Sequence, residues 1–267
     1  MKKTANRLKG FLTSPWMTAA AFVLAVVLLL SGSIGGARAA LTYYSDNYSS
    51  RIQLQDIGVT LLENEKAVSW RNYTSDGTWE EQEGMLLADM LTGSDGTTED
   101  FKIGKTYPEE LKVQNTGTIS QYVRVTIYKY WTDEEGNRRA DLSPDMIGLR
   151  LANPDSGWIR DEKAQTLERT VLYYSRPLEA GENGDGETTV PFADALTIDG
   201  SVAAKVTREE KEENGFTTIT TTYDYDHAAF CVKTEVDAIQ AHNAPDAALS
   251  AWGRRISVED GILSLED

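Results

Sequence analysis

The sequence has few of the residues on which common catalytic and metal sites depend. Its 267 residues include one cysteine, Cys231, and two histidines, His227 and His242. A single cysteine excludes a disulfide within one chain. The sequence contains neither the H-E-x-x-H motif of zinc proteases nor the G-x-S-x-G elbow of serine hydrolases. We expect both histidines to be turn or strand-end residues and Cys231 to be an inert thiol, with an intermolecular disulfide as the alternative.

Positive charge is scarce after the first 39 residues. The chain holds 26 basic and 42 acidic residues, a net charge of −16. Five of the basic residues and none of the acidic ones lie before residue 40, which leaves a net charge of about −21 on the remainder. Such a surface repels nucleic acid and anionic lipid, because both are bound through clustered lysine and arginine. We therefore expect no nucleic-acid partner, and a solvated surface typical of a secreted protein.

Long apolar runs are absent except at the N-terminus. A basic start precedes an apolar run at 19–30, and small residues then lead to Ala37-Arg38-Ala39. These are the three parts of a secretory signal peptide. The apolar run is shorter than the ~20 residues that span a bilayer, although no charge occurs between the basic start and Arg38, so an uncleaved membrane anchor is the alternative. We expect a signal peptidase to cleave near Ala39 or Ala40, with Ala37 and Ala39 as the small residues it reads, and the mature chain to be secreted.

The rest of the chain is predicted to consist of short strands. Residues 119–131 alternate with period two and are rich in β-branched and aromatic side chains, the pattern of a half-buried strand. Further strands are expected at 52–62, 106–115, 166–174, 217–225, 230–240 and 256–265. The turn signal Asn115-Thr116-Gly117 predicts a hairpin or a Greek-key pair of strands, because glycine tolerates positive φ. A second hairpin is predicted around Asp226-His227.

Helix is predicted in only two places. Ser143-Pro144 begins a short helix to Leu149, and 244–252 forms another, with Asn243 as its cap and Gly253 as its stop. The prediction is therefore an all-β fold: a signal peptide at 1–39, carrying a hydrophobic signal helix, and one antiparallel β-sandwich at 40–267. A loop and helix insertion is expected around 132–165.

Acidic turns and tyrosines are the remaining candidate sites. Acidic turns at 95–100, 133–137 and 181–188 offer the oxygen ligands that calcium prefers, but none has the EF-hand pattern. We expect no cofactor, with calcium at these loops as the alternative. The tyrosines near expected strands suggest either sugar or subunit contacts, or cross-strand packing in the core; they are Tyr43, Tyr44, Tyr48, Tyr122, Tyr128 and Tyr130.

Two short segments are distinctive. The first is Gly35-Gly36 followed by Ala37–Asp46. It is similar to the junction of the TasA/camelysin family of exported proteins of Gram-positive bacteria, which has a Gly-rich end, alanine, an aromatic residue, and then Ser or Thr with Asp. A dedicated signal peptidase processes that junction. Lys112–Ile119 resembles the family's K-x-x-N-T-G strand end. Residues 132–215 and 236–253 have no counterpart in the best-known members, so the chain looks like a divergent member.

The resemblance implies a jelly-roll-like sandwich and a role as a biofilm-matrix or cell-surface fibre protein. In such fibres the freed N-terminal strand of one subunit adds to the sheet of the next, as in β-augmentation. Cleavage would free the donor strand, and the partners would be other copies of the chain, other matrix proteins and the signal peptidase. The donor would run from Leu41 to Ile57, with assembly residues Leu41, Tyr43, Tyr44, Ile52, Leu54 and Ile57, the last three filling pockets.

Other functions are compatible with the sequence. The family includes proteins described as metalloproteases, but the two histidines of this chain do not support carrying that activity over. The first alternative is a surface module that binds polysaccharide or another ligand through exposed aromatic residues. The second is an exported metal-dependent hydrolase with an unfamiliar site. We expect no enzyme activity.

Overall fold

The computed structural model describes residues 19, 22–24, 56–73, 77–82, 84, 86–87, 90–92, 97–213 and 216–266. The chain divides into two compact units, residues 1–53 and 54–267. In the first unit the described residues, 19 and 22–24, are helical. Within the described part of the chain, no helix has the length and apolar character needed to cross a membrane. The expected cleavage residues Ala37, Ala39 and Ala40 lie outside the described residues.

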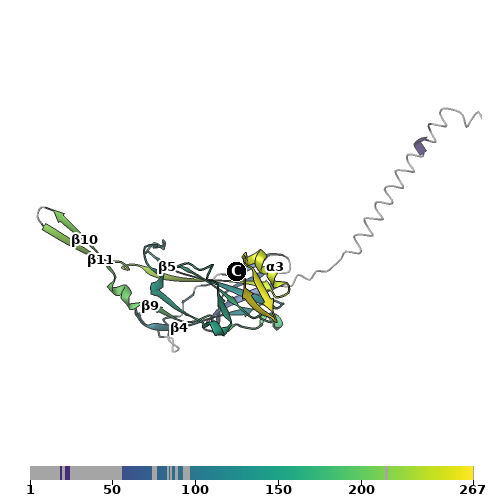
Figure 1. The fold of residues 1–267 in the computed structure, drawn as a ribbon, viewed down its shortest axis with the longest axis horizontal. Coiled ribbons are helices and arrows are strands. Elements are labelled where there is room, and N and C mark those ends of the chain that lie inside the picture. The colour runs from purple at the N-terminus through teal and green to yellow at the C-terminus, as the bar shows by residue number, and fades with distance from the viewer. Residues whose placement is uncertain are drawn as a thin grey trace, which may run out of the picture. The chain divides into compact units, whose positions relative to one another are not determined.

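The second unit is built on two antiparallel sheets (Figure 1). The larger has six strands in the order β3-β2-β1-β4-β9-β6. Their bounds are β1 Ile57–Glu63, β2 Lys66–Tyr73, β3 Trp79–Gln82, β4 Thr106–Asn115, β6 Ile147–Leu151 and β9 Ala193–Ile198. The smaller has four strands in the order β12-β5-β8-β7. They are β5 Gln121–Thr132, β7 Trp158–Arg160, β8 Arg169–Tyr174 and β12 Ala229–Gln240.

Two ribbons and several short helices complete the unit. The ribbons are β10 Val206–Glu213 with β11 Phe216–Tyr223, and β13 Ile256–Glu259 with β14 Ile262–Leu265. The helical elements are η1 Pro144–Met146, η2 Pro154–Ser156, η3 Glu182–Gly184, η4 Gly200–Ala204 and α3 Ala244–Trp252. The β10–β11 ribbon projects from the sandwich (Figure 1).

The core lies between the two sheets and follows the predicted alternation. Val123, Val125 and Ile127 of β5 are at most 1% exposed and share one cluster with Val59 and Leu61 of β1. A second cluster covers the other face of the four-stranded sheet, where β5, β8 and β12 meet α3 and the β13–β14 ribbon; its buried members are Tyr122, Val171, Tyr173, Ile239, Ala244, Ala248, Ile256 and Leu263. The predicted all-β antiparallel sandwich is therefore confirmed.

The predicted pairing of 106–115 with 119–131 is wrong. Both strands exist, but β4 belongs to the six-stranded sheet and β5 to the four-stranded one. The chain crosses between the sheets at the turn after Asn115. Gly117 does not have a positive φ. Its role is to let two backbone segments approach closely, because a Cβ at this position would lie 2.5 Å from the Asp56 carbonyl oxygen and 2.7 Å from the Gly58 nitrogen.

The second predicted hairpin is also wrong. The strand expected at 217–225 is β11, and its partner is β10, which the sequence analysis did not identify. β12 pairs instead with β5 along its whole length, from Ala229 opposite Thr132 to Gln240 opposite Gln121. Twelve residues in continuous register give β12 more cross-strand contacts than the shorter β11 offers.

The helix expected at 143–149 is a single 3₁₀ turn, and Ile147 begins β6. The region 132–165, expected to be loop and helix, therefore contributes β6 to one sheet and β7 to the other. The strand expected at 256–265 is a hairpin, β13–β14. Helix α3 has the predicted bounds and ends at Gly253 with φ of 64°, although the Asn243 side chain bonds to Asp246 Oδ2 at 2.8 Å and does not cap a backbone N–H.

Candidate strand-accepting groove

Strand β12 forms an edge of the four-stranded sheet. Among the described strands only β5 pairs with it. The N–H of Ala241 donates to the carbonyl of Ser120 at 2.9 Å, which continues the register of the two strands. In an antiparallel ladder hydrogen-bonded pairs alternate with non-bonded pairs. The odd-numbered residues of β12 therefore bond to β5, and the backbone groups of Phe230, Val232, Thr234, Val236 and Ala238 point away from it.

This edge has no backbone partner in the described part of the chain. None of its five outward-facing residues donates or accepts a backbone hydrogen bond with another described residue. A row of unpaired N–H and C=O groups is a template for a further strand. The edge runs over residues 230–238, which spans roughly 27 Å at 3.4 Å per residue. β12 is therefore a candidate acceptor for an added strand.

A groove of about 660 Å³ borders this edge. One wall is β12, and the other is formed by β1, β2, β3 and residues 84, 86, 87 and 90. Apolar side chains line much of it, among them Val59, Leu61, Val68, Leu87, Val232 and Val236. Val59 and Leu61 lie opposite Arg71 and Ser69 in the register of β1 and β2. Directly paired residues share a face, so the inner face of the sheet changes from apolar to polar at β2, and the groove forms at that boundary.

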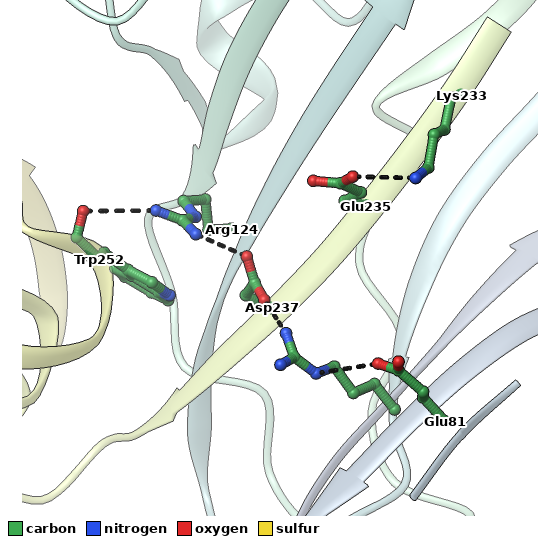
Figure 2. Close-up of polar contacts among 7 residues, drawn as sticks. Glu81, Arg124, Lys233, Glu235, Asp237 and Trp252 are labelled. Carbon is green, nitrogen blue, oxygen red and sulfur yellow. Dashed lines mark hydrogen bonds and ion pairs between the residues drawn. The ribbon is translucent and has the colours of Figure 1, made fainter. Parts of the chain in front are cut away.

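An ion cluster around Asp237 contributes to the lining of the groove, and Figure 2 shows its contacts. Asp237 Oδ2 accepts from Arg124 Nη2 at 2.6 Å, and its Oδ1 accepts from Arg71 Nη1, also at 2.6 Å. Arg124 lies directly opposite Asp237 in the β5–β12 register, whereas Arg71 comes from β2 of the other sheet. The Arg71 side chain therefore crosses the open edge of β12 to reach a carboxylate on the strand's outer face.

The two arginines make further contacts, Arg71 with β3 and Arg124 with α3. Arg71 also lies over the Trp79 ring at 4.4 Å and 3.6 Å from Glu81 Oε2. Arg124 Nη1 donates to the carbonyl of Trp252, at the end of α3, at 3.5 Å (Figure 2). The side chains of Arg71, Arg124 and Asp237 are 20–40% exposed, so solvent screens the ion pairs and each contributes about 1 kcal/mol or less. The arrangement links both sheets and α3 without being a major source of stability.

The structure places one predicted assembly residue in a different role. Ile57 begins β1, where it pairs with Tyr73 of β2 and is half-buried. Because it is already part of its own sheet, a donor segment must end before it. The other five, Leu41, Tyr43, Tyr44, Ile52 and Leu54, lie outside the described residues.

The histidines and the cysteine do not converge on one site. His227 is in a turn with φ of 59°, and its Nδ1 lies 2.8 Å from Glu134 Oε1. His242 is exposed in the turn before α3. Cys231 is half-buried opposite Tyr130, and its hydrogen bond to the Tyr130 hydroxyl, together with burial, raises the pKa of that tyrosine. Within the described residues, no group of three or more His, Cys, Asp or Glu side chains is placed to hold a metal ion.

The acidic turns have local structural partners. In the turn 133–137, Asp133 accepts hydrogen bonds from the backbone N–H of Asn137 at 2.8 Å and from its side-chain amide at 3.1 Å. In the loop 181–188, Asp185 accepts from Gln114 Nε2 at 3.0 Å. Of the turn at 95–100, residues 95 and 96 lie outside the described part.

Sequence reasoning missed the groove and most of the ion cluster. One signal was present: Arg124 and Asp237 are opposite charges on the two strongest alternating strands, which would suit a cross-strand pair. The contribution of Arg71 had no such signal, since 166 residues separate it from Asp237. No protein-family model, curated protein or solved structure matches the chain.

Proposed function

We propose that the mature chain is a secreted structural subunit that assembles head to tail by strand donation. The N-terminal segment 41–55 of one subunit adds to the free edge of β12 in the next and places its apolar side chains in the groove. The observation that carries this proposal is the unpaired edge of β12 beside an apolar groove. Strand addition uses such edges: backbone hydrogen bonds provide affinity, and alternate side chains fill pockets.

The lengths of the two segments are compatible. Fifteen residues from 41 to 55 extend to roughly 50 Å, and the acceptor edge needs roughly 27 Å. About seven residues are then left over, on the N-terminal side of an inserted strand that includes Ile52 and Leu54. Ile52 and Leu54 are two residues apart, so both point to the same face of an extended strand and enter the groove together.

In this proposal, cleavage of the signal peptide determines when assembly begins. Before cleavage, residue 41 is joined to the apolar run at 19–30, which keeps the donor at the membrane. After cleavage the segment is free to join another subunit. A head-to-tail contact of this kind does not close on itself and produces an open filament.

Electron microscopy of the secreted protein tests the proposal. We expect filaments from the wild-type precursor and no filaments from a precursor in which residues 42–55 are deleted, with both chains cleaved at the same junction. Filaments of the same form from both chains would exclude strand donation. The absence of filaments from both would exclude a filament-forming function.

One observation favours surface binding as a second candidate function. A polar groove of about 340 Å³ on the outer face of the four-stranded sheet is lined by Tyr128 and Trp252 together with Arg124, Lys163 and Arg254. Aromatic rings beside hydrogen-bonding groups are suited to a polysaccharide. Binding to a glycan array that is lost in Tyr128→Ala and Trp252→Ala would support this function, and an array without hits would exclude it.

A further inference from the structure

In the described part of the chain, the β10–β11 ribbon has no packing partner that accounts for its stability. Its two strands pair only with each other among the described strands. Residues 207–212 and 217–223 are exposed on both faces, with Ile219 63% and Tyr223 57% exposed. A two-stranded hairpin is marginally stable in water at best, and three or more strands or a packed face are needed for independent stability. The ribbon therefore has the properties of an incomplete sheet.

The two edges of the ribbon differ in charge. β10 carries six charged residues in eight, from Arg208 to Glu213, whereas β11, with the sequence FTTITTTY, carries none. Charged side chains are the usual protection of an exposed edge against pairing. β11 lacks this protection and is composed of threonine, isoleucine and aromatic residues, which favour strands. The open edge of the ribbon is therefore β11.

Hydrogen bonding shows which groups β11 presents. The N–H of Asp224 donates to the carbonyl of Lys205 at 3.0 Å, in continuation of the Val206–Tyr223 register. By alternation, the even-numbered residues of β11 bond to β10. The N–H and C=O groups of Thr217, Ile219, Thr221 and Tyr223 then point away from β10. Among the described residues, Thr217, Ile219 and Thr221 have no backbone hydrogen bond outside the ribbon, while the Tyr223 carbonyl at the end of the strand accepts from the N–H of Asp226 at 3.2 Å.

We infer that β11 pairs with β11 of a second copy of this chain. Two antiparallel β11 strands across a two-fold axis would form the four-stranded sheet β10-β11-β11-β10. The same patch faces itself in such a contact, and this requires a self-complementary surface. An uncharged strand meets the requirement in a chain whose net charge is −16, because other acidic surfaces of two copies repel each other.

The composition of the two strands also limits this contact to two copies. Cross-strand threonine pairs are favourable, at about 0.2–1 kcal/mol each. After pairing, the edges of the four-stranded sheet are both β10, whose four glutamates discourage further addition. The contact does not use the β12 edge or residues 41–55, so it is independent of strand donation.

Proline substitutions distinguish the two edges of the ribbon. Thr221→Pro removes an N–H that points away from β10, so it leaves the bonds within the ribbon intact and blocks a strand arriving at β11. Arg208→Pro is the matched control, since Arg208 lies directly opposite Thr221 and its N–H points outward from the other edge. Both variants have the same effect on the ribbon, but only one blocks the proposed contact.

The experiment uses the full chain, residues 1–267, purified uncleaved in detergent, so that strand donation cannot contribute. We expect sedimentation velocity to show a dimer for wild type and for Arg208→Pro, and a dissociation constant raised at least about tenfold for Thr221→Pro. Circular dichroism checks that both variants are folded. A monomeric wild type at the highest concentration reached, or equal dissociation constants for the two proline variants, would overturn the inference.

Discussion

Arg71 and Asp237 belong to different sheets, and their side chains meet 2.6 Å apart across the open edge of β12. Asp237 does not depend on this contact, because Arg124 of the neighbouring strand binds its other oxygen at 2.6 Å. The arginine therefore covers the edge without being required to neutralise the carboxylate. A side chain that crosses an unpaired edge hinders the addition of a strand.

Replacing Arg71 should accelerate assembly. We expect Arg71→Ala to lower the free energy of unfolding by about 1 kcal/mol or less and to shorten the lag before filaments appear in light scattering. Glu81→Gln is the control, since it removes only the 3.6 Å contact of Arg71 with Glu81 and keeps the bond to Asp237. An unchanged or longer lag for Arg71→Ala would show that the arginine does not restrict the edge.

Blocking the edge of β12 should prevent assembly without unfolding the protein. The N–H of Thr234 points away from β5, so Thr234→Pro removes no bond of the sheet. We expect a small change in urea stability and no filaments by electron microscopy. Glu235→Pro removes a bond to β5 instead and should cost about 1–3 kcal/mol. Equal destabilisation by the two prolines would contradict the hydrogen-bond directions assigned to this edge.

The crossing between the sheets should depend on the absence of a side chain at residue 117. A Cβ there would lie 2.5 Å from the backbone of Asp56, and backbone atoms cannot move aside as a flexible side chain does. We expect Gly117→Ala to lower the free energy of unfolding by about 1–3 kcal/mol in chemical denaturation. Gly200→Ala is the control, because a Cβ there would meet nothing within 4 Å. Equal stability of both variants would refute this explanation of Gly117.

Burial lowers the pKa of Lys129, whose ammonium donates to the carbonyl of Ile147 at 2.7 Å. Between the lowered pKa of the folded state and the ordinary value near 10.4, the unfolded chain binds more protons than the folded one. This group therefore makes stability rise with pH in that window. We expect the rise to be smaller in Lys129→Met when urea unfolding is followed from pH 7 to 10. A variant with the same slope as wild type would show that Lys129 titrates normally.

Patterns local in sequence predicted the elements better than their partners. The alternation of Val123, Val125 and Ile127 identified β5 and its buried face, because a strand with one face in the core repeats every two residues. Proline in the first turn and Gly253 after the last gave the bounds of α3. Both signals depend only on residues within about a dozen positions of each other, and the structure has the strand and the helix that they predict.

Which strands pair with each other depends on residues far apart in the sequence, and the predicted pairings were wrong. β4 and β5 are consecutive in sequence with a turn between them, yet they lie in different sheets, since the turn residues are used to cross the sandwich. Ser143-Pro144 predicts a helix that reaches Leu149, because Ser-Pro is a helix start, but residues from Ile147 onward belong to β6. The groove required β2 and β12 to be placed together, and no sequence pattern connects them.

The projecting ribbon changes the kind of material that this chain would form. A subunit with one donor and one acceptor has two points of attachment, and such units give only linear chains. The contact proposed for the β11 edge adds a third. Units with three attachments branch and connect into a network that spans its volume, so a dilute suspension of filaments would become an elastic gel. The uncharged strand Phe216–Tyr223 would then control the stiffness of the material, independently of the length of its filaments.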